Sequence, residues 1–139
     1  MKYINFMLVG IVLLSVISGC ISGTEAPEKT QYAEISVQQA KAMIDGGGVF
    51  ILDVRTQEEY DAGHINGSVR IPVQDIKVKE ELDKELTKIP RDRKILVYCR
   101  TGIRSAQASE VLVNNGFTEV YSMKGGITDW TGAGYEVIK

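Results

Sequence analysis

Residues 94–105 read Lys-Ile-Leu-Val-Tyr-Cys-Arg-Thr-Gly-Ile-Arg-Ser and set the architecture expected of this chain. The run Lys94–Tyr98 predicts a buried β-strand, and a segment with helical periodicity follows the loop that holds Gly102. The backbone N–H groups of such a loop and of the first helical turn converge, and the helix dipole adds positive potential, so the arrangement favours an anion. Cys99 stands at the tip of the strand, where we expect its thiol to ionise easily and to react as a thiolate.

On either side of this stretch, strands alternate with helices, which predicts an α/β fold with a mostly parallel central sheet and helices on both faces. Ser36 and Gln39 fit a capping box at the start of the first helix. Sites in such sheets collect at the carboxyl ends of the strands, where both Asp53–Arg55 and Cys99 are expected. The expected strands are 32–35, 49–54, 68–71, 94–98 and 119–121, and the later helical segments are 56–60, 78–86, 105–115 and 127–131.

Composition limits the class of protein. The 139 residues suffice for one domain of ordinary size, and a formal net charge of −2 argues against nucleic acid as a partner. The single histidine excludes a His-rich metal site, and a mixed site lacks clustered ligands, so we expect no metal and no cofactor. The two cysteines are Cys20 and Cys99; because Cys20 lies near the N-terminus, we expect no disulfide within the folded domain.

The first residues have the proportions of a secretory signal peptide, with an apolar stretch from Phe6 to Ile17 that is short for a membrane span. Small residues directly before Cys20 resemble the lipobox of prokaryotic lipoproteins. We therefore predict a signal peptide over 1–19, a lipidated Cys20 with a flexible tether over 20–31, and one folded domain over 32–139. The protein would then be exported and anchored outside the cytoplasmic membrane; a plain cleaved signal or an uncut anchor is the alternative.

Three separated segments resemble the rhodanese domain, a sulfurtransferase module. The resemblance covers residues 32–138 and implies a single-domain, rhodanese-like member of the thiosulfate sulfurtransferase type. The segments are Asp53-Val54-Arg55 with Glu59-Tyr60 and Gly63–Ser68, then Tyr98–Ser105, then Gly125–Trp130.

The resemblance implies that Cys99 attacks the outer sulfur of a donor such as thiosulfate and carries it as a persulfide to a thiol or to cyanide. Backbone N–H groups of the loop would hold the charged sulfur, and Arg100 and Arg104 would bind the oxygens of the donor. The substrate-binding residues expected on this basis are Arg100, Thr101, Gly102, Ile103, Arg104 and Ser105. The partners would be a small sulfur-donor anion, a thiol acceptor and, through Cys20, the membrane; we expect a monomer.

Other residues are expected to support the site. Asp53 would accept hydrogen bonds from the loop, and Arg55 would pair with Glu59. His64, although a tempting general base, is expected to be structural, and Trp130 to cover the core. Alternative functions are a non-catalytic sulfur carrier and a rhodanese-like cysteine phosphatase or arsenate reductase; the phosphatases have one more residue between cysteine and arginine than the four found here.

Overall fold

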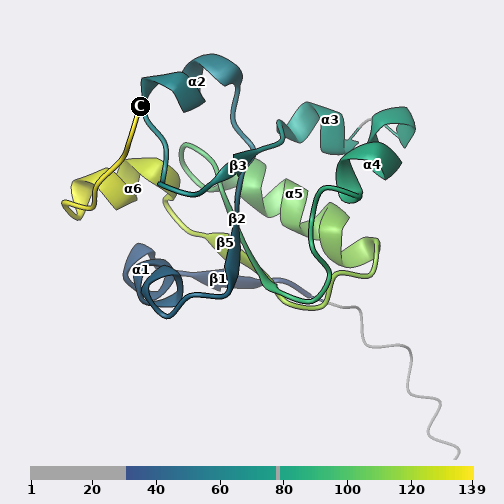
Figure 1. The fold of residues 1–139 in the computed structure, drawn as a ribbon, viewed down its shortest axis with the longest axis horizontal. Coiled ribbons are helices and arrows are strands. Elements are labelled where there is room, and N and C mark those ends of the chain that lie inside the picture. The colour runs from purple at the N-terminus through teal and green to yellow at the C-terminus, as the bar shows by residue number, and fades with distance from the viewer. Residues whose placement is uncertain (1–30, 78) are drawn as a thin grey trace, which may run out of the picture.

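A computed structural model describes residues 31–77 and 79–139 of the chain. Its central feature is a five-stranded sheet in the order β1-β5-β4-β2-β3, in which every neighbouring pair is parallel (Figure 1). The strands are β1 (Ala33–Ile35), β2 (Val49–Asp53), β3 (Val69–Arg70), β4 (Lys94–Tyr98) and β5 (Val120–Met123). The predicted α/β class is confirmed. The expected signal peptide, Cys20 and nearly all of the tether lie outside the described residues.

Helices cover both faces of the sheet, as the sequence predicts. The α1 and α6 helices pack on one face, and α3, α4 and α5 lie on the other (Figure 1). Successive residues of β4 alternate between the two sides: Ile95 and Val97 join the core under α5, whereas Leu96 and Tyr98 join the core under α1 and α6. A strand buried on both faces is therefore apolar at every central position. The helices are α1 (Val37–Asp45), α2 (Gln57–Ala62), α3 (Val73–Lys77), α4 (Lys79–Leu86), α5 (Ile103–Asn114) and α6 (Gly126–Gly132).

The helix ends show how local sequence fixes these elements. The predicted capping box is present, since the Ser36 side chain accepts from the Gln39 N–H and Gln39 accepts from the Ser36 N–H. Thr56 and Glu59 form a second capping box that starts α2. The α5 helix begins at Ile103, two residues before the expected start, because the loop after Cys99 turns directly into its first turn. The α3 helix was missed, since its five residues carry little periodicity.

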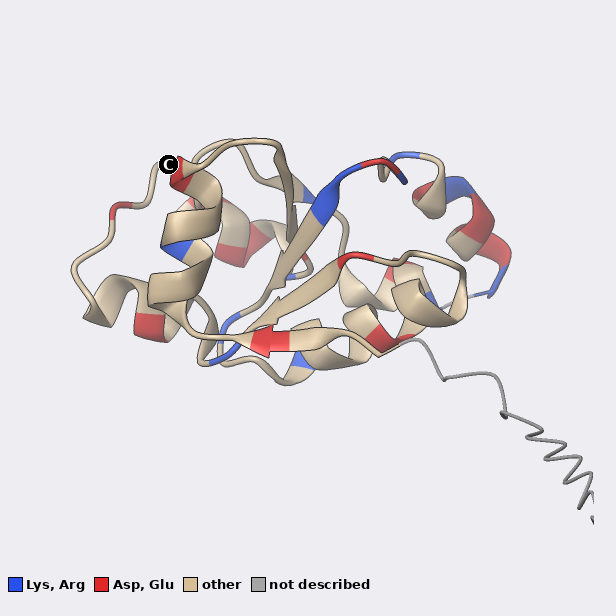
Figure 2. Cartoon of the chain, turned by 90° about the horizontal axis from the view of Figure 1, so that it is seen from below, with Lys and Arg blue, Asp and Glu red and all other residues tan. Residues whose placement is uncertain are grey.

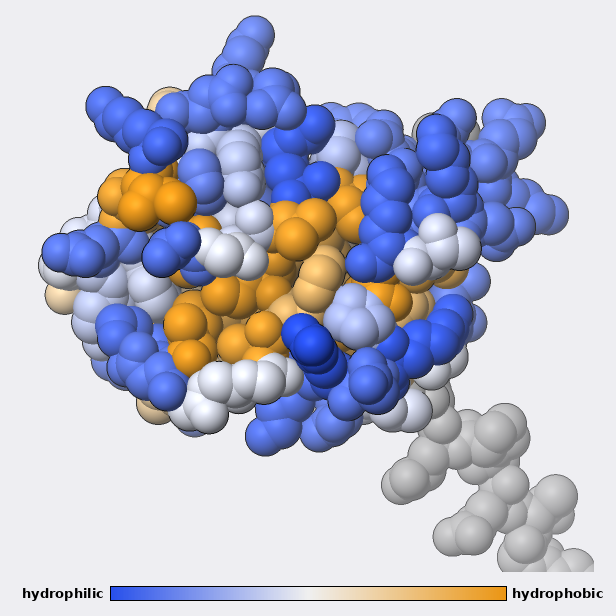
Figure 3. Space-filling model, viewed as in Figure 1, coloured by the Kyte–Doolittle hydropathy of each residue, from blue (hydrophilic) through white to orange (hydrophobic). Residues whose placement is uncertain are grey.

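The surface divides into charged and apolar parts. The α4 helix carries acidic and basic residues along most of its length (Figure 2), and all of them are exposed except Glu85, which is buried. Apolar side chains gather over β2 and β3 at the centre of the face in Figure 3, where β3 covers only the last two residues of β2. Val69 of this edge is 41% exposed.

Candidate active site

The loop after β4 wraps its backbone around the sulfur of Cys99. Gly102 N–H donates to Sγ at 3.1 Å, and Sγ lies 3.7 Å from the hydroxyl oxygen of Ser105. Gly102 adopts a φ of +104°, in the left-handed region that favours glycine. This backbone conformation directs the N–H groups of the loop inward, toward the sulfur.

The α6 N-terminus holds the same loop from outside. Ile127 N–H donates to the Cys99 carbonyl at 2.9 Å, and Thr128 donates to the Arg100 carbonyl from both its N–H (3.2 Å) and its hydroxyl (3.0 Å). Because these carbonyls point toward α6, the amides of the loop are free to point the other way. The third segment of the family resemblance thus has a structural task that its sequence pattern did not reveal.

Cys99 is buried, yet the pKa of its thiol is lowered. The residue is only 1% exposed and packs in the core cluster under α5. Burial alone would raise the pKa of its thiol, but the backbone N–H and hydroxyl of Ser105 and the N–H groups of Gly102 and Thr101 outweigh it and lower the pKa. A buried thiol in an apolar pocket would show the opposite shift.

The partner of Arg104 differs from the expected one. Its guanidinium makes two hydrogen bonds of 2.6 Å to the Glu59 carboxylate on α2. The predicted Arg55–Glu59 pair is therefore wrong, because Glu59 is taken by an arginine 45 residues away. The Arg104 guanidinium holds the pKa of Glu59 down, to about 2. Arg104 is thus engaged by Glu59, and Arg100 is exposed in this structure.

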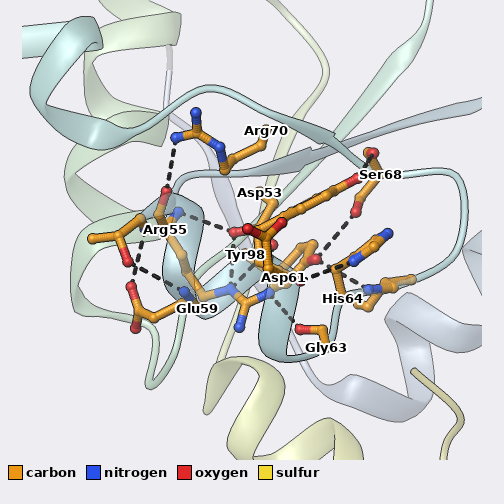
Figure 4. A network of polar contacts seen from close by, with 12 residues as sticks. Asp53, Arg55, Glu59, Asp61, Gly63, His64, Ser68, Arg70 and Tyr98 are labelled. Carbon is orange, nitrogen blue, oxygen red and sulfur yellow. Dashed lines mark hydrogen bonds and ion pairs between the residues drawn. The ribbon is translucent and has the colours of Figure 1, made fainter. Parts of the chain in front are cut away.

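Arg55 pairs instead with Asp53, at the end of β2 (Figure 4). Its Nη2 lies 2.6 Å from Asp53 Oδ2 and 2.8 Å from the Gly63 carbonyl, and its Nε donates to both carboxylate oxygens. Burial alone would lower the pKa of Arg55, but Asp53 raises it above its ordinary value. Asp53 also accepts from the Arg55 N–H at 2.9 Å, whereas the sequence predicts donors from the cysteine loop. Through the bond to Gly63, the pair ties the end of β2 to the end of α2.

Replacing Asp53 by asparagine is expected to destabilise the fold by about 3–5 kcal/mol, because it leaves the buried Arg55 charge without its partner. Urea unfolding of the full-length chain measures this. The matched control is Asp45→Asn, which removes the exposed Lys41–Asp45 pair and should cost at most about 1 kcal/mol. Equal midpoints for the two variants would contradict the structural role of the buried pair.

His64 and Trp130 both make structural contacts. The His64 ring stacks on Tyr60 with centroids 3.7 Å apart, and its Nδ1 lies 2.9 Å from the Tyr60 carbonyl. Its backbone exchanges two hydrogen bonds of 2.8 Å with Ile138, which anchors the C-terminal segment. Trp130 is 3% exposed and lies in the core cluster under α1 and α6, as predicted.

A groove beside the loop is lined by Thr101, Gly102 and Ile103 together with Glu34, Lys124 and Gly125. Ile103 is 69% exposed there. Within residues 31–77 and 79–139, no three histidine, cysteine or acidic side chains are placed to hold a metal ion. Over the same residues, no helix has the length and hydropathy needed to cross a bilayer.

Among curated relatives, the tRNA uridine(34) hydroxylase of Photorhabdus laumondii is 30% identical over 116 residues, which cover 83% of this chain and 32% of that protein. The enzyme of the same name from Escherichia coli is 33% identical over 98 residues, covering 69% and 27%. The chain thus spans about a third of the length of these relatives.

Solved structures of the same fold include a rhodanese-related protein from Thermoplasma volcanium, with a TM-score of 0.67 and 32% identity over 77% of this chain and 98% of that one. A Rhodopseudomonas palustris protein described as a possible tyrosine phosphatase has a TM-score of 0.65 and 25% identity, covering 77% and 85%. Residues 36–133 match the rhodanese-like domain family. With a parallel sheet, a cysteine loop at its carboxyl edge and this match over most of its length, the chain belongs to the rhodanese-like domain family.

Proposed function

We propose that this protein is a sulfurtransferase that moves sulfane sulfur from thiosulfate or a polysulfide to a thiol or to cyanide through a persulfide on Cys99. The observation that carries the proposal is the contact of Gly102 N–H with Sγ at 3.1 Å, in a loop whose amides lower the thiol pKa. Such a loop stabilises the negative sulfur both before and after the transfer, with little reorganisation.

The proposed reaction has two displacement steps. The Cys99 thiolate attacks the outer sulfur of thiosulfate, a new S–S bond forms, and sulfite leaves with the electron pair of the broken S–S bond. An acceptor thiolate or cyanide then attacks the outer sulfur of the persulfide, and the Cys99 thiolate returns. Because Cys99 is 1% exposed, the proposal requires a local movement of the atoms that cover Sγ before the donor can reach it. The groove beside the loop, with Lys124 on its wall, offers an approach for an anion.

A phosphatase or arsenate reductase is the second candidate, favoured by the likeness to a protein described as a possible tyrosine phosphatase. Two features weigh against it. Four residues separate Cys99 from Arg104, which makes a ring one residue smaller than the phosphatases use, and Arg104 is engaged by Glu59. The curated relatives act on tRNA by name, but they share with this chain about a third of their length. These relatives therefore support the rhodanese-like domain in the proposal, and a tRNA substrate is not proposed for this chain.

The full-length chain incubated with thiosulfate is expected to gain the mass of one sulfur atom on the peptide that contains Cys99, and to form thiocyanate when cyanide is added. Intact-mass and peptide mass spectrometry measure the first, and a colorimetric assay the second. A mass gain without turnover would assign the chain as a sulfur carrier. Release of phosphate from an aryl phosphate, without thiocyanate, would replace the proposal with the phosphatase.

The proposed location is the outer face of the cytoplasmic membrane, with Cys20 lipidated and the chain monomeric. It rests on the apolar stretch that ends at Cys20 and on the small residues before it. Expression in a bacterial host and mass analysis of the N-terminal peptide test it: a diacylglyceryl-modified Cys20 supports the anchor, and an unmodified N-terminus after cleavage supports a plain secreted protein.

A further inference from the structure

A buried hydroxyl on β5 lies directly behind the cysteine loop. Ser122 is 1% exposed, and its hydroxyl donates to the Ser105 hydroxyl oxygen at 3.0 Å. Ser105, which is fully buried in the first turns of α5, in turn lies 3.7 Å from Cys99 Sγ. Ser122 Oγ, Ser105 Oγ and Cys99 Sγ therefore form a chain of polar atoms that joins β5, α5 and the loop.

The sheet register accounts for this placement. Ser122 is the parallel partner of Val97, so its side chain points to the same face as Val97 and Cys99, the face that α5 covers. A serine there is unusual, because its neighbours Val120 and Met123 are apolar and a buried hydroxyl needs a hydrogen-bond partner. Ser105 supplies that partner.

The hydrogen bonds of Ser105 indicate how Ser122 affects the Ser105 hydroxyl. Ser105 has one hydroxyl proton, which goes to the Gly102 carbonyl at 3.0 Å in this structure and is the proton available to a thiolate on Cys99. The proton donated by Ser122 occupies a lone pair of Ser105 Oγ, fixes the orientation of that side chain and polarises its O–H bond. Hydrogen bonds in such chains strengthen one another in a low-dielectric interior.

We infer that Ser122 is a positioning residue for the sulfur chemistry: it acts through Ser105 to stabilise the negatively charged sulfur on Cys99. The inference deepens the proposed function and rests on it for its biological meaning. The effect of these hydrogen bonds on the Cys99 thiol can be measured without any sulfur donor.

The test is the pH dependence of iodoacetamide alkylation at Cys99 in the full-length chain, followed by peptide mass spectrometry because Cys20 is also a thiol. The midpoint of the profile reports the thiol pKa, so a change in access alters the rate but not the midpoint. Ser122→Ala is expected to raise the pKa by about half a unit, a loss of roughly threefold in thiolate at a pH below it.

The chain offers a matched control in Ser109. It is fully buried on α5, and its hydroxyl has no hydrogen-bond partner among the described residues. Ser109→Ala thus removes a buried hydroxyl that is not connected to the sulfur. Both variants leave the charged groups around the loop in place, namely Asp53, Glu59, Arg100, Arg104 and Lys124.

Three further results decide the inference. Ser109→Ala should leave the midpoint unchanged, Ser105→Ala should raise it at least as far as Ser122→Ala, and the double variant should shift it no further than Ser105→Ala does. An unchanged midpoint in Ser122→Ala, an equal shift in Ser109→Ala, or additive shifts in the double variant would each overturn it. If Ser122→Ala raises the pKa of the Cys99 thiol as expected but the parent protein transfers no sulfur, the proposed function is contradicted. The inference about Ser122 and Ser105 then still holds.

Discussion

The Cys99→Ser chain is expected to form no persulfide with thiosulfate and to produce thiocyanate only at the rate of an enzyme-free blank. A serine hydroxyl is far less acidic than a thiol, so the loop amides that favour a thiolate would have no anion to stabilise, and no persulfide could form on oxygen. Thiocyanate formation and intact mass measure the two losses. In the parent chain, persulfide formation should slow as the pH falls through the lowered pKa of Cys99, because the thiolate fraction then falls.

The matched control is Cys20→Ser, since Cys20 is the other cysteine of the sequence and lies outside the domain match. It should retain the full rate and the full mass gain. Both variants should unfold at the same urea concentration as the parent, or nearly so, because each exchange is nearly isosteric. Retained turnover in Cys99→Ser would remove Cys99 as the nucleophile and with it the proposed function.

Gly126→Ala should displace the cysteine loop, because Gly126 lies against its backbone carbonyls. A Cβ at Gly126 would lie 2.4 Å from the Arg100 carbonyl oxygen and 2.5 Å from that of Cys99, the two carbonyls that α6 binds. The backbone there has a φ of +60°, which costs a non-glycine residue about 1–2 kcal/mol, and the overlap adds about 1–3 kcal/mol. Because the loop has to shift, sulfur transfer should fall by up to about 100-fold. Urea unfolding and thiocyanate formation measure the two effects.

Gly47→Ala separates the cost of a positive φ from the effect of the overlap with the loop carbonyls. Gly47 has a φ of +76°, but among the described residues, its two chain neighbours aside, no heavy atom lies within 4 Å of the Cβ that alanine would add. This variant should lose about 1–2 kcal/mol of stability and keep the parent rate of transfer. If Gly126→Ala also keeps that rate, the loop does not depend on its contact with α6.

Local pattern was sufficient for much of the fold. The apolar runs predicted β2 and β4 to within one residue, and the capping box predicted the start of α1, because each rests on contacts within a few residues along the chain. Short elements fared worse: β3 has two residues where four were expected, and the five-residue α3 was missed. Such segments are held by their neighbours and carry too few residues for a period to show.

Within the candidate site, the sequence alone was enough to single out Cys99, the glycine that shapes its loop and the arginines nearby. It could not say which charges pair: Arg55 binds Asp53, and Arg104 reaches across to Glu59. Nor could it show that α6 binds the loop carbonyls or that Ser122 stands behind Ser105. Apart from the Arg55–Asp53 pair, which lies within one turn of chain after β2, these contacts join residues far apart in the sequence. They exist because the strand order β1-β5-β4-β2-β3 brings the carboxyl ends of β2, β4 and β5 to one edge. Hydrophobic period and backbone caps are local properties, whereas the partner of a charge or hydroxyl depends on which strands become neighbours.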